Sequence, residues 1–195
     1  MRQIRPLDPT TDRARVEEFF TAAQDYVILE RDEPPGPEVT DEFFTQTPPG
    51  VDPSASQRLG LFDGDHLQAL VEMSFGFPEA DSAYIGLLIA LPAARGTGAG
   101  TALLRACETF ARQRGAREIF MAVLDANPKG RAFWEREGFR LHLADRPVTL
   151  GTKTQIAHRL GKALYSGAMD LKEAVKVGLG LAAAPLPAKK KKAKR

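Results

Sequence analysis

The chain has 195 residues and a formal net charge of +2, and this length is enough to bury the core of one globular domain. No apolar run approaches the roughly 18 residues of a membrane-spanning helix, and the first residues, MRQIRPLDPTTDR, lack the apolar core of a secretory signal. We therefore expect a cytoplasmic protein with no membrane contact. The single cysteine, Cys107, excludes an intramolecular disulfide, and we expect it to be buried.

The positive charge is concentrated at the C-terminal end. Residues 182–195, AAAPLPAKKKKAKR, contain six cations and no acid, so the rest of the chain has a net charge of −4. Such a segment has little to bury, and we expect residues 183–195 to form a disordered basic tail. This tail either keeps the chain soluble or makes a weak nucleic-acid contact through residues 189–195.

The N-terminal part predicts a short strand at QIRPL and then helices. From Asp12, a plausible N-cap, apolar residues recur at helical spacing and predict one helix reaching Val27. Two proline-rich loops follow, with a second helix between them starting at Thr40. We expect the loops to form a variable lid.

Residues 58–78 predict two strands joined by a hairpin at Asp63-Gly64-Asp65. Glu72 lies in the middle of the second strand, on its more polar face, where Leu70 is the apolar exception. Residues 83–92, AYIGLLIALP, are apolar on both faces, which is typical of a central strand covered by helices.

This central strand leads directly into three alternating glycines and then into an amphipathic helix that ends at Gly115. Further along, the pattern predicts a strand, a helix and two strands, over residues 118–124, 128–138, 139–145 and 152–160. The fold class is therefore α/β (α+β), with a mixed sheet of about seven strands flanked by helices.

Residues 166–182 predict one further helix, because Asp170 and Glu173 form a pair similar to a capping box. We expect this helix to be an appendage to the main domain, residues 1–165. Its apolar edge would pack on that domain or on a second copy in a homodimer.

Glycines between a strand and a helix let the backbone turn sharply, and they let amide N–H groups point at a ligand. The positive end of the helix favours an anion, above all a pyrophosphate. The sequence lacks the GxxxxGK[ST] pattern of P-loops, and Thr101 stands where the dinucleotide pattern GxGxxG needs its last glycine.

The sequence R-G-T-G-A-G, residues 95–100, resembles the pyrophosphate loop [QR]-x-x-G-x-[GA] of the GNAT superfamily of N-acetyltransferases. The segment NPKGRAFWEREGF, residues 127–139, is similar to the family's N-x-x-A-x-x-F-Y-E-x-x-G-F segment. The resemblance is clear over residues 58–160, and covers the first two helices by their order only. It implies a mostly antiparallel sheet whose central strand pair is splayed.

The resemblance also implies how the co-substrate acetyl-CoA binds. One edge of the central strand would pair with the pantetheine amides, and Asn127 would bind the pantetheine arm unless it only caps a helix. Trp134 would pack against the sulfur end, or be an ordinary core aromatic. The strand residues are Leu87, Leu88 and Ile89, and the backbone amides for the pyrophosphate belong to Arg95, Gly96, Thr97, Gly98, Ala99 and Gly100.

Acetyl transfer to an amine by direct attack on the thioester needs a base, because an alkylammonium with a pKa near ~10.4 is almost wholly protonated at neutral pH. Glu72 is our candidate base. The family's usual acid is a tyrosine, but this chain has Trp134 there, and indole cannot act as a proton donor. Tyr84 and Tyr26 are the candidate substitutes, and an amide near Ile89 is the candidate oxyanion donor.

Three function classes follow from these patterns. The first is an acetyl-CoA-dependent N-acetyltransferase acting on a small amine or a protein amino group, with Glu30 and Glu33 attracting a cationic acceptor. The alternative is a non-catalytic acyl-CoA-binding or regulatory module, suggested by Trp134. A third class makes the basic tail the operative part. Three scattered histidines have no metal-binding spacing, so no metal is expected.

Overall fold

A computed structural model describes residues 1–165 of the chain. The predicted helix over residues 166–182 and the basic tail over residues 183–195 lie outside the described residues. No helix within residues 1–165 is long and apolar enough to cross a membrane.

The described residues form one seven-stranded sheet with five α-helices and two short 3-10 helices. The strand order is β1-β2-β3-β4-β5-β7-β6, and all neighbours are antiparallel except β4 and β5. This confirms the predicted mixed, mostly antiparallel sheet. In chain order the elements are β1 (Arg2–Pro6), α1 (Arg13–Ala22), α2 (Gln24–Arg31), α3 (Pro37–Thr45), η1 (Pro53–Ala55), β2 (Gln57–Asp63), β3 (His66–Phe75), β4 (Ser82–Ala90), η2 (Pro92–Ala94), α4 (Ala99–Gln113), β5 (Glu118–Leu124), α5 (Pro128–Arg136), β6 (Arg140–Leu150) and β7 (Lys153–Ala163).

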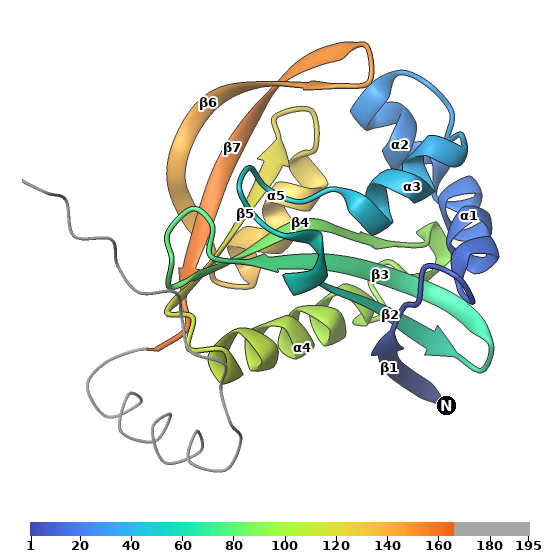
Figure 1. Cartoon of the computed structure of the whole chain (residues 1–195). Helices are drawn as coiled ribbons and strands as arrows, with labels where there is room; N and C mark the ends of the chain where they lie inside the picture. The colour runs from blue at the N-terminus through green and yellow to red at the C-terminus, as the bar shows by residue number, and fades with distance from the viewer. Residues whose placement is uncertain (166–195) are drawn as a thin grey trace, which may run out of the picture. The chain divides into compact units, whose positions relative to one another are not determined.

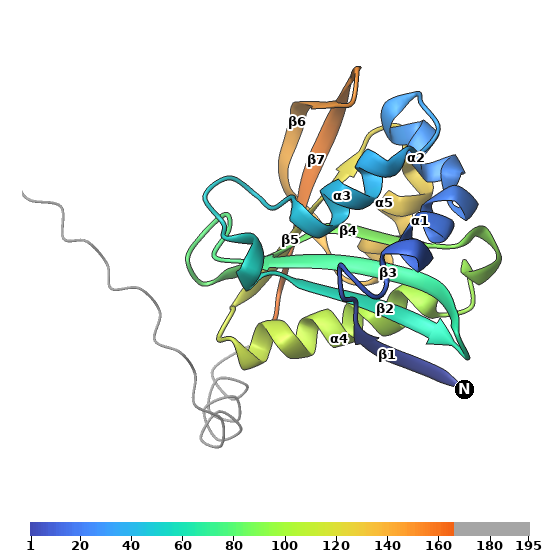
Figure 2. The same ribbon diagram turned by 45° about the vertical axis from the view of Figure 1, so that its right-hand side comes forward.

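Helices cover both faces of the central strands. Helices α1, α2 and α3 lie on one face of β2, β3 and β4, and α4 lies on the opposite face (Figures 1 and 2). Under α1 and α3, a core cluster gathers Val16, Phe19, Phe20, Phe43 and Leu70. Since both faces are covered, β3 is buried almost throughout.

This burial corrects the expectation that Glu72 lies on a polar face. The Glu72 side chain is only 5% exposed, and Leu70 on the same face is fully buried. The Glu72 and Ser74 side chains of β3 therefore do not face solvent, because α1 and α3 pack over this face of the strand (Figure 1).

Two helix boundaries also differ from the sequence prediction. The first helix is broken at Ala23 into α1 and α2, and α3 begins at Pro37 rather than at Thr40. Proline suits the first turn of a helix, since its missing N–H would have no partner there. Asp12 precedes α1 but makes no capping hydrogen bond, because its carboxylate binds the Arg5 guanidinium instead.

The two central strands separate along their length. β4 and β5 pair only from Ser82–Ile85 with Glu118–Met121. Beyond Ile85, β4 stays paired with β3, while β5 stays paired with β7. The C-terminal half of β4 therefore has an open edge, which is the splayed pair that the family resemblance implies.

The hairpin of β6 and β7 is longer than expected, since β6 continues past residue 145 to Leu150. Its tip reaches α2 (Figure 1). Lys153 Nζ donates to the Leu29 carbonyl at 3.1 Å, and Gln155 Nε2 donates to the Glu30 carbonyl at 2.6 Å. The hairpin thus fixes the C-terminal end of α2 over the sheet.

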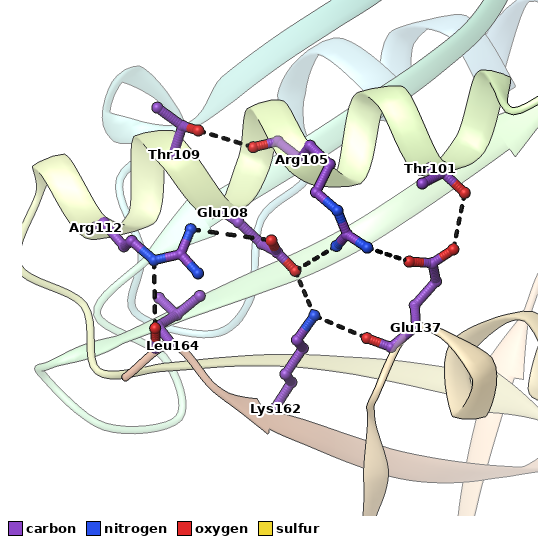
Figure 3. A network of polar contacts seen from close by, with 8 residues as sticks. All are labelled: Thr101, Arg105, Glu108, Thr109, Arg112, Glu137, Lys162 and Leu164. Atoms are coloured by element: carbon purple, nitrogen blue, oxygen red, sulfur yellow. Dashed lines mark hydrogen bonds and ion pairs between the residues drawn. The ribbon is translucent and has the colours of Figure 1, made fainter. Parts of the chain in front are cut away.

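On the other face, a polar network joins α4, the end of α5 and β7 (Figure 3). Glu108 of α4 is 4% exposed, and accepts from Lys162 Nζ at 2.6 Å and from Arg105 at 2.9 Å. Glu137 accepts from Arg105 at 2.7 Å and from the Thr101 hydroxyl at 2.8 Å. These contacts fix α4 relative to the segment after α5.

Candidate functional site

The glycine loop between η2 and α4 is exposed and open. Gly96 has φ 77° and Gly98 has φ 86°, a backbone conformation that residues with a Cβ rarely adopt. No atom lies within 4 Å of where a Cβ would stand on either glycine. The first-turn amides of α4 have no partners within the helix, so they are free to bind an anion.

Gly100 has different surroundings from the other two glycines. A Cβ on Gly100 would lie 3.4 Å from Phe133 Cζ and 3.5 Å from Leu88 Cδ2. A Cβ would therefore make ordinary van der Waals contact there, and the start of α4 lies beside Phe133 of α5 and Leu88 of β4.

Two arginine side chains connect the glycine loop to neighbouring elements. Arg2 of β1 donates to the carbonyl and to the hydroxyl of Thr97, each at 3.0 Å. Arg95 donates to Asp25 Oδ1 of α2 at 2.9 Å, and this contact lowers the pKa of Asp25. The Arg95 side chain thus points at α2. The Arg95 amide donates to the Pro92 carbonyl and the Thr97 amide to the Ala94 carbonyl, each at 3.3 Å, so these two amides predicted for the pyrophosphate already have partners in the chain.

Asn127 and Trp134, the two candidates from residues 127–139, make contacts that stabilise the fold. Asn127 Oδ1 accepts from the Gly130 amide at 2.9 Å, so Asn127 caps α5, as its alternative interpretation held. Trp134 is 6% exposed, and its ring packs edge-to-face on Phe133 and Phe139. Trp134 is therefore a core aromatic, and Phe133 is the neighbour that approaches the glycine loop.

A cavity of about 290 Å³ lies on the other face of β4. Glu72, Tyr84, Leu87 and Ile89 line it, whereas Leu88 points to the opposite side, toward Gly100. Its other walls come from α1–α3, the loop after α3, Phe77 and the β6–β7 hairpin, and include Phe20, Val27, Glu30, Arg31, Val39, Glu42, Phe43, Pro48, Leu150 and Arg159.

Glu72 is held in this cavity mainly by neutral donors. Ser74 Oγ donates to Glu72 Oε1 at 2.6 Å. The Ser56 hydroxyl in turn hydrogen-bonds the Ser74 hydroxyl, with 2.8 Å between the two oxygens. A Cβ on Gly86 would collide with Glu72 Oε2, so glycine leaves room for the carboxylate in this position. Burial raises the pKa of Glu72, and the Ser74 hydroxyl, the charge of Arg58 and the Gly86 amide offset part of that rise.

Tyr84 pairs with Ser74 in the register of the sheet and lines the same cavity as Glu72. Burial raises the pKa of Tyr84 as well, and the positive charge of Arg159 offsets part of that rise. Tyr26 also has a raised pKa because it is buried, but it does not line the cavity. The structure thus brings Tyr84, and not Tyr26, to the side of Glu72.

The two acidic residues expected to attract an acceptor lie apart. Glu30 lines the cavity, where burial raises its pKa, and it contacts Arg31. Glu33 instead accepts from the Thr152 hydroxyl at 3.1 Å, on the β6–β7 hairpin. Only Glu30 belongs to the site.

The sequence prediction missed Ser56, Ser74, Gly86 and Arg159 as site residues. Ser74 could have been found, because it follows Glu72 by two positions on the same strand face. Ser56 and Arg159 come from distant segments, and no local pattern marks them. In the described part of the chain, no cluster of three or more His, Cys, Asp or Glu side chains could hold a metal.

Comparisons with known proteins agree with this geometry. The family model described as "Acetyltransferase (GNAT) family" matches residues 17–139. A comparison with curated protein sequences finds no match.

Solved structures share the fold over most of their length. An acetyltransferase from Thermus thermophilus is 25% identical, with a TM-score of 0.64, covering 84% of this chain and 97% of that one. The ribosomal-protein-S18-alanine N-acetyltransferase from Escherichia coli is 18% identical, with a TM-score of 0.63 and coverages of 86% and 97%. The GNAT domain of S. lividans PAT is 22% identical, with a TM-score of 0.62 and coverages of 83% and 90%. The chain belongs to the GNAT acetyltransferase family.

Proposed function

We propose that the protein is an acetyl-CoA-dependent N-acetyltransferase that acetylates a small amine in the Glu72 cavity. The observation that carries the proposal is the open edge of β4. This edge starts after Ile85, beside the cavity, and the same strand leads into the glycine loop at the start of α4. β4 therefore lies next to the buried Glu72 carboxylate and leads directly to the glycine loop, where an anion can bind.

The residues of this chain fit acetyl-CoA. The amides of Gly96, Gly98, Ala99 and Gly100 would hold its diphosphate, since the loop is exposed and no side chain fills the space at Gly96 and Gly98. The open edge at Leu87–Ile89 would hold the amides of its pantetheine arm. When bound, acetyl-CoA supplies an acetyl group activated as a thioester.

Glu72 acts as the base. Its raised pKa makes it a stronger proton acceptor than an exposed glutamate, and it takes the proton from the ammonium group directly or through one water. The amine nitrogen forms a bond to the acetyl carbon as the bond from that carbon to sulfur breaks. The proton leaves the amine for Glu72, and the sulfur leaves with the electron pair.

Tyr84 supplies a proton to the leaving sulfur in this scheme. Its raised pKa keeps the phenol protonated at neutral pH, and it lines the cavity. Trp134 cannot replace it, because indole N–H is not a usable acid and the ring is packed in the core. A thiol with a pKa near ~8.5 leaves without obligatory protonation, so Tyr84→Phe should lower kcat by about tenfold or less.

The test is release of free coenzyme A from acetyl-CoA in the presence of a panel of small amines. The proposal expects saturable turnover with at least one amine, and mass spectrometry of the product should show one added acetyl group. The alternative, a binding module, expects tight acetyl-CoA binding with no turnover in the wild type or in Trp134→Tyr. That result would replace the enzyme proposal.

A further inference from the structure

Two arginines line the cavity, and they differ in whether a carboxylate pairs with them. Arg31 contacts the carboxylate of Glu42. Arg159 has no carboxylate within ion-pair distance among residues 1–165. Its guanidinium carbon lies 5.2 Å from the centroid of the Phe77 ring, and its charge offsets part of the rise that burial causes in the pKa of the neighbouring Tyr84. Within the described residues, Arg159 is thus a half-buried cation without a counter-ion at the wall of the cavity.

A guanidinium stays charged at any pH that the fold tolerates, and its planar fork matches the two oxygens of a carboxylate. It offers five N–H donors at the wall of the cavity, so two of them can bind one ligand carboxylate. The chemistry that would balance Arg159 is therefore a carboxylate brought by the acceptor.

Glu72 and Arg159 come from opposite sides of the diverging strand pair. Glu72 lies on β3, next to β4, and Arg159 lies on β7, next to β5. Both groups line the same cavity as Tyr84, and both charges act on the pKa of that tyrosine. An acceptor with an ammonium and a carboxylate can face both groups at once.

The remaining walls limit the body of such an acceptor. Phe20, Val27 and Phe43 are buried apolar residues that line the cavity. The volume of about 290 Å³ is at the lower end of ligand pockets, which start at roughly 300 Å³. The acceptor therefore has a compact apolar part.

We infer that the acceptor is a free amino acid with an apolar side chain, whose amine faces Glu72 and whose carboxylate pairs with Arg159. This inference rests on the proposed function and names the substrate class of that site. It makes Arg159 the residue that selects amino acids over simple amines.

The first experiment compares two substrates that differ only in the carboxylate, L-phenylalanine and 2-phenylethylamine. In the wild type, kcat/KM should favour the amino acid by at least tenfold. In Arg159→Met this ratio should fall to about one, and in Arg159→Lys it should lie between. The matched control is Arg117→Met, whose side chain is 69% exposed outside the cavity and should leave the ratio unchanged. An equal ratio in the wild type and Arg159→Met would overturn the inference.

A second experiment does not depend on turnover. N-acetyl-L-phenylalanine and N-acetyl-2-phenylethylamine are titrated into the wild type and Arg159→Met by calorimetry, with coenzyme A present. The carboxylate compound should bind the wild type at least tenfold more tightly, and Arg159→Met should remove that difference. Equal binding to the wild type, or no binding of either compound, would overturn the inference.

The two experiments separate failure of the inference from failure of the proposed function. If simple amines are acetylated without regard to Arg159, the enzyme proposal stands and the amino acid assignment falls. If no amine is acetylated but Arg159 controls carboxylate binding, the assignment of the cavity stands and the transfer proposal falls.

Discussion

Two glutamates are buried to nearly the same degree on opposite faces of the sheet, Glu72 at 5% and Glu108 at 4% exposure. Glu108 has three cations around it, since Lys162, Arg105 and Arg112 all lie within 4 Å (Figure 3). Glu72 instead accepts a hydroxyl hydrogen bond at the wall of a cavity. Glu72 and Glu108 are therefore distinguished by their hydrogen-bond and ion-pair partners, and not by the extent of their burial. A paired carboxylate holds the fold together, whereas one with neutral donors keeps its ability to take a proton.

The largest effect that separates the two carboxylates is expected in turnover. Glu72→Gln removes the base but keeps the shape, and should lower kcat by about 10²–10⁴-fold, the range for general base catalysis. Glu108→Gln changes a carboxylate that touches no part of the site, and should keep the turnover per folded molecule within about twofold. Coenzyme A release, normalised to the folded fraction from circular dichroism, measures both. Equal losses in the two variants would contradict the assignment.

For the free energy of unfolding, the contacts of Glu108 should matter more than those of an exposed ion pair. Lys162→Met leaves Glu108 buried with one cation fewer, and should lower the free energy of unfolding by about 3 kcal/mol. Arg131→Met is the matched control, because the Arg131–Glu135 pair is exposed and worth less than about 1 kcal/mol. Urea unfolding at neutral pH measures both changes. Lys162→Met unfolding at the same urea concentration as the control would show that the network contributes little.

The stability of the protein should also depend on pH through Glu72. The pKa of Glu72 is raised in the folded state, so the folded protein binds this proton more tightly than the unfolded chain. Its ionisation therefore costs stability as the pH rises from the ordinary pKa of 4.5 through the raised value. Glu72→Gln removes this cost, so its melting temperature should gain on the wild type between pH 4 and pH 8. A difference that is constant over this range would contradict a raised pKa.

The sequence predicted the features that local spacing determines. The strand, the alternating glycines and the amphipathic helix α4 lie within about 30 consecutive residues, and the structure has all three in place. The sequence also indicated Glu72 as a site residue, but it placed this side chain on a polar face, whereas the structure buries it. Whether a strand face is solvated depends on α1 and α3, which come from a distant part of the chain.

The features that the sequence did not predict come from long-range packing. Apolar spacing continues through Ala23, so the break between α1 and α2 has no local signal. Trp134 occupies the position of the family's tyrosine, but its ring packs on Phe133 and Phe139 in the core. Arg159 lies 87 positions after Glu72, and only the strand order of the sheet brings both to one cavity.

The most direct test of the account compares the two ends of α4. Gly98 at its start and Gly115 after its end both have positive φ, 86° and 77°, with open space where a Cβ would stand. Alanine should cost about 1–2 kcal/mol of stability at either position. Titration with acetyl-CoA by calorimetry should show one site per chain, weakened about tenfold by Gly98→Ala and unchanged by Gly115→Ala. The same affinity in both variants, or no binding to the wild type, would contradict a diphosphate site at the glycine loop.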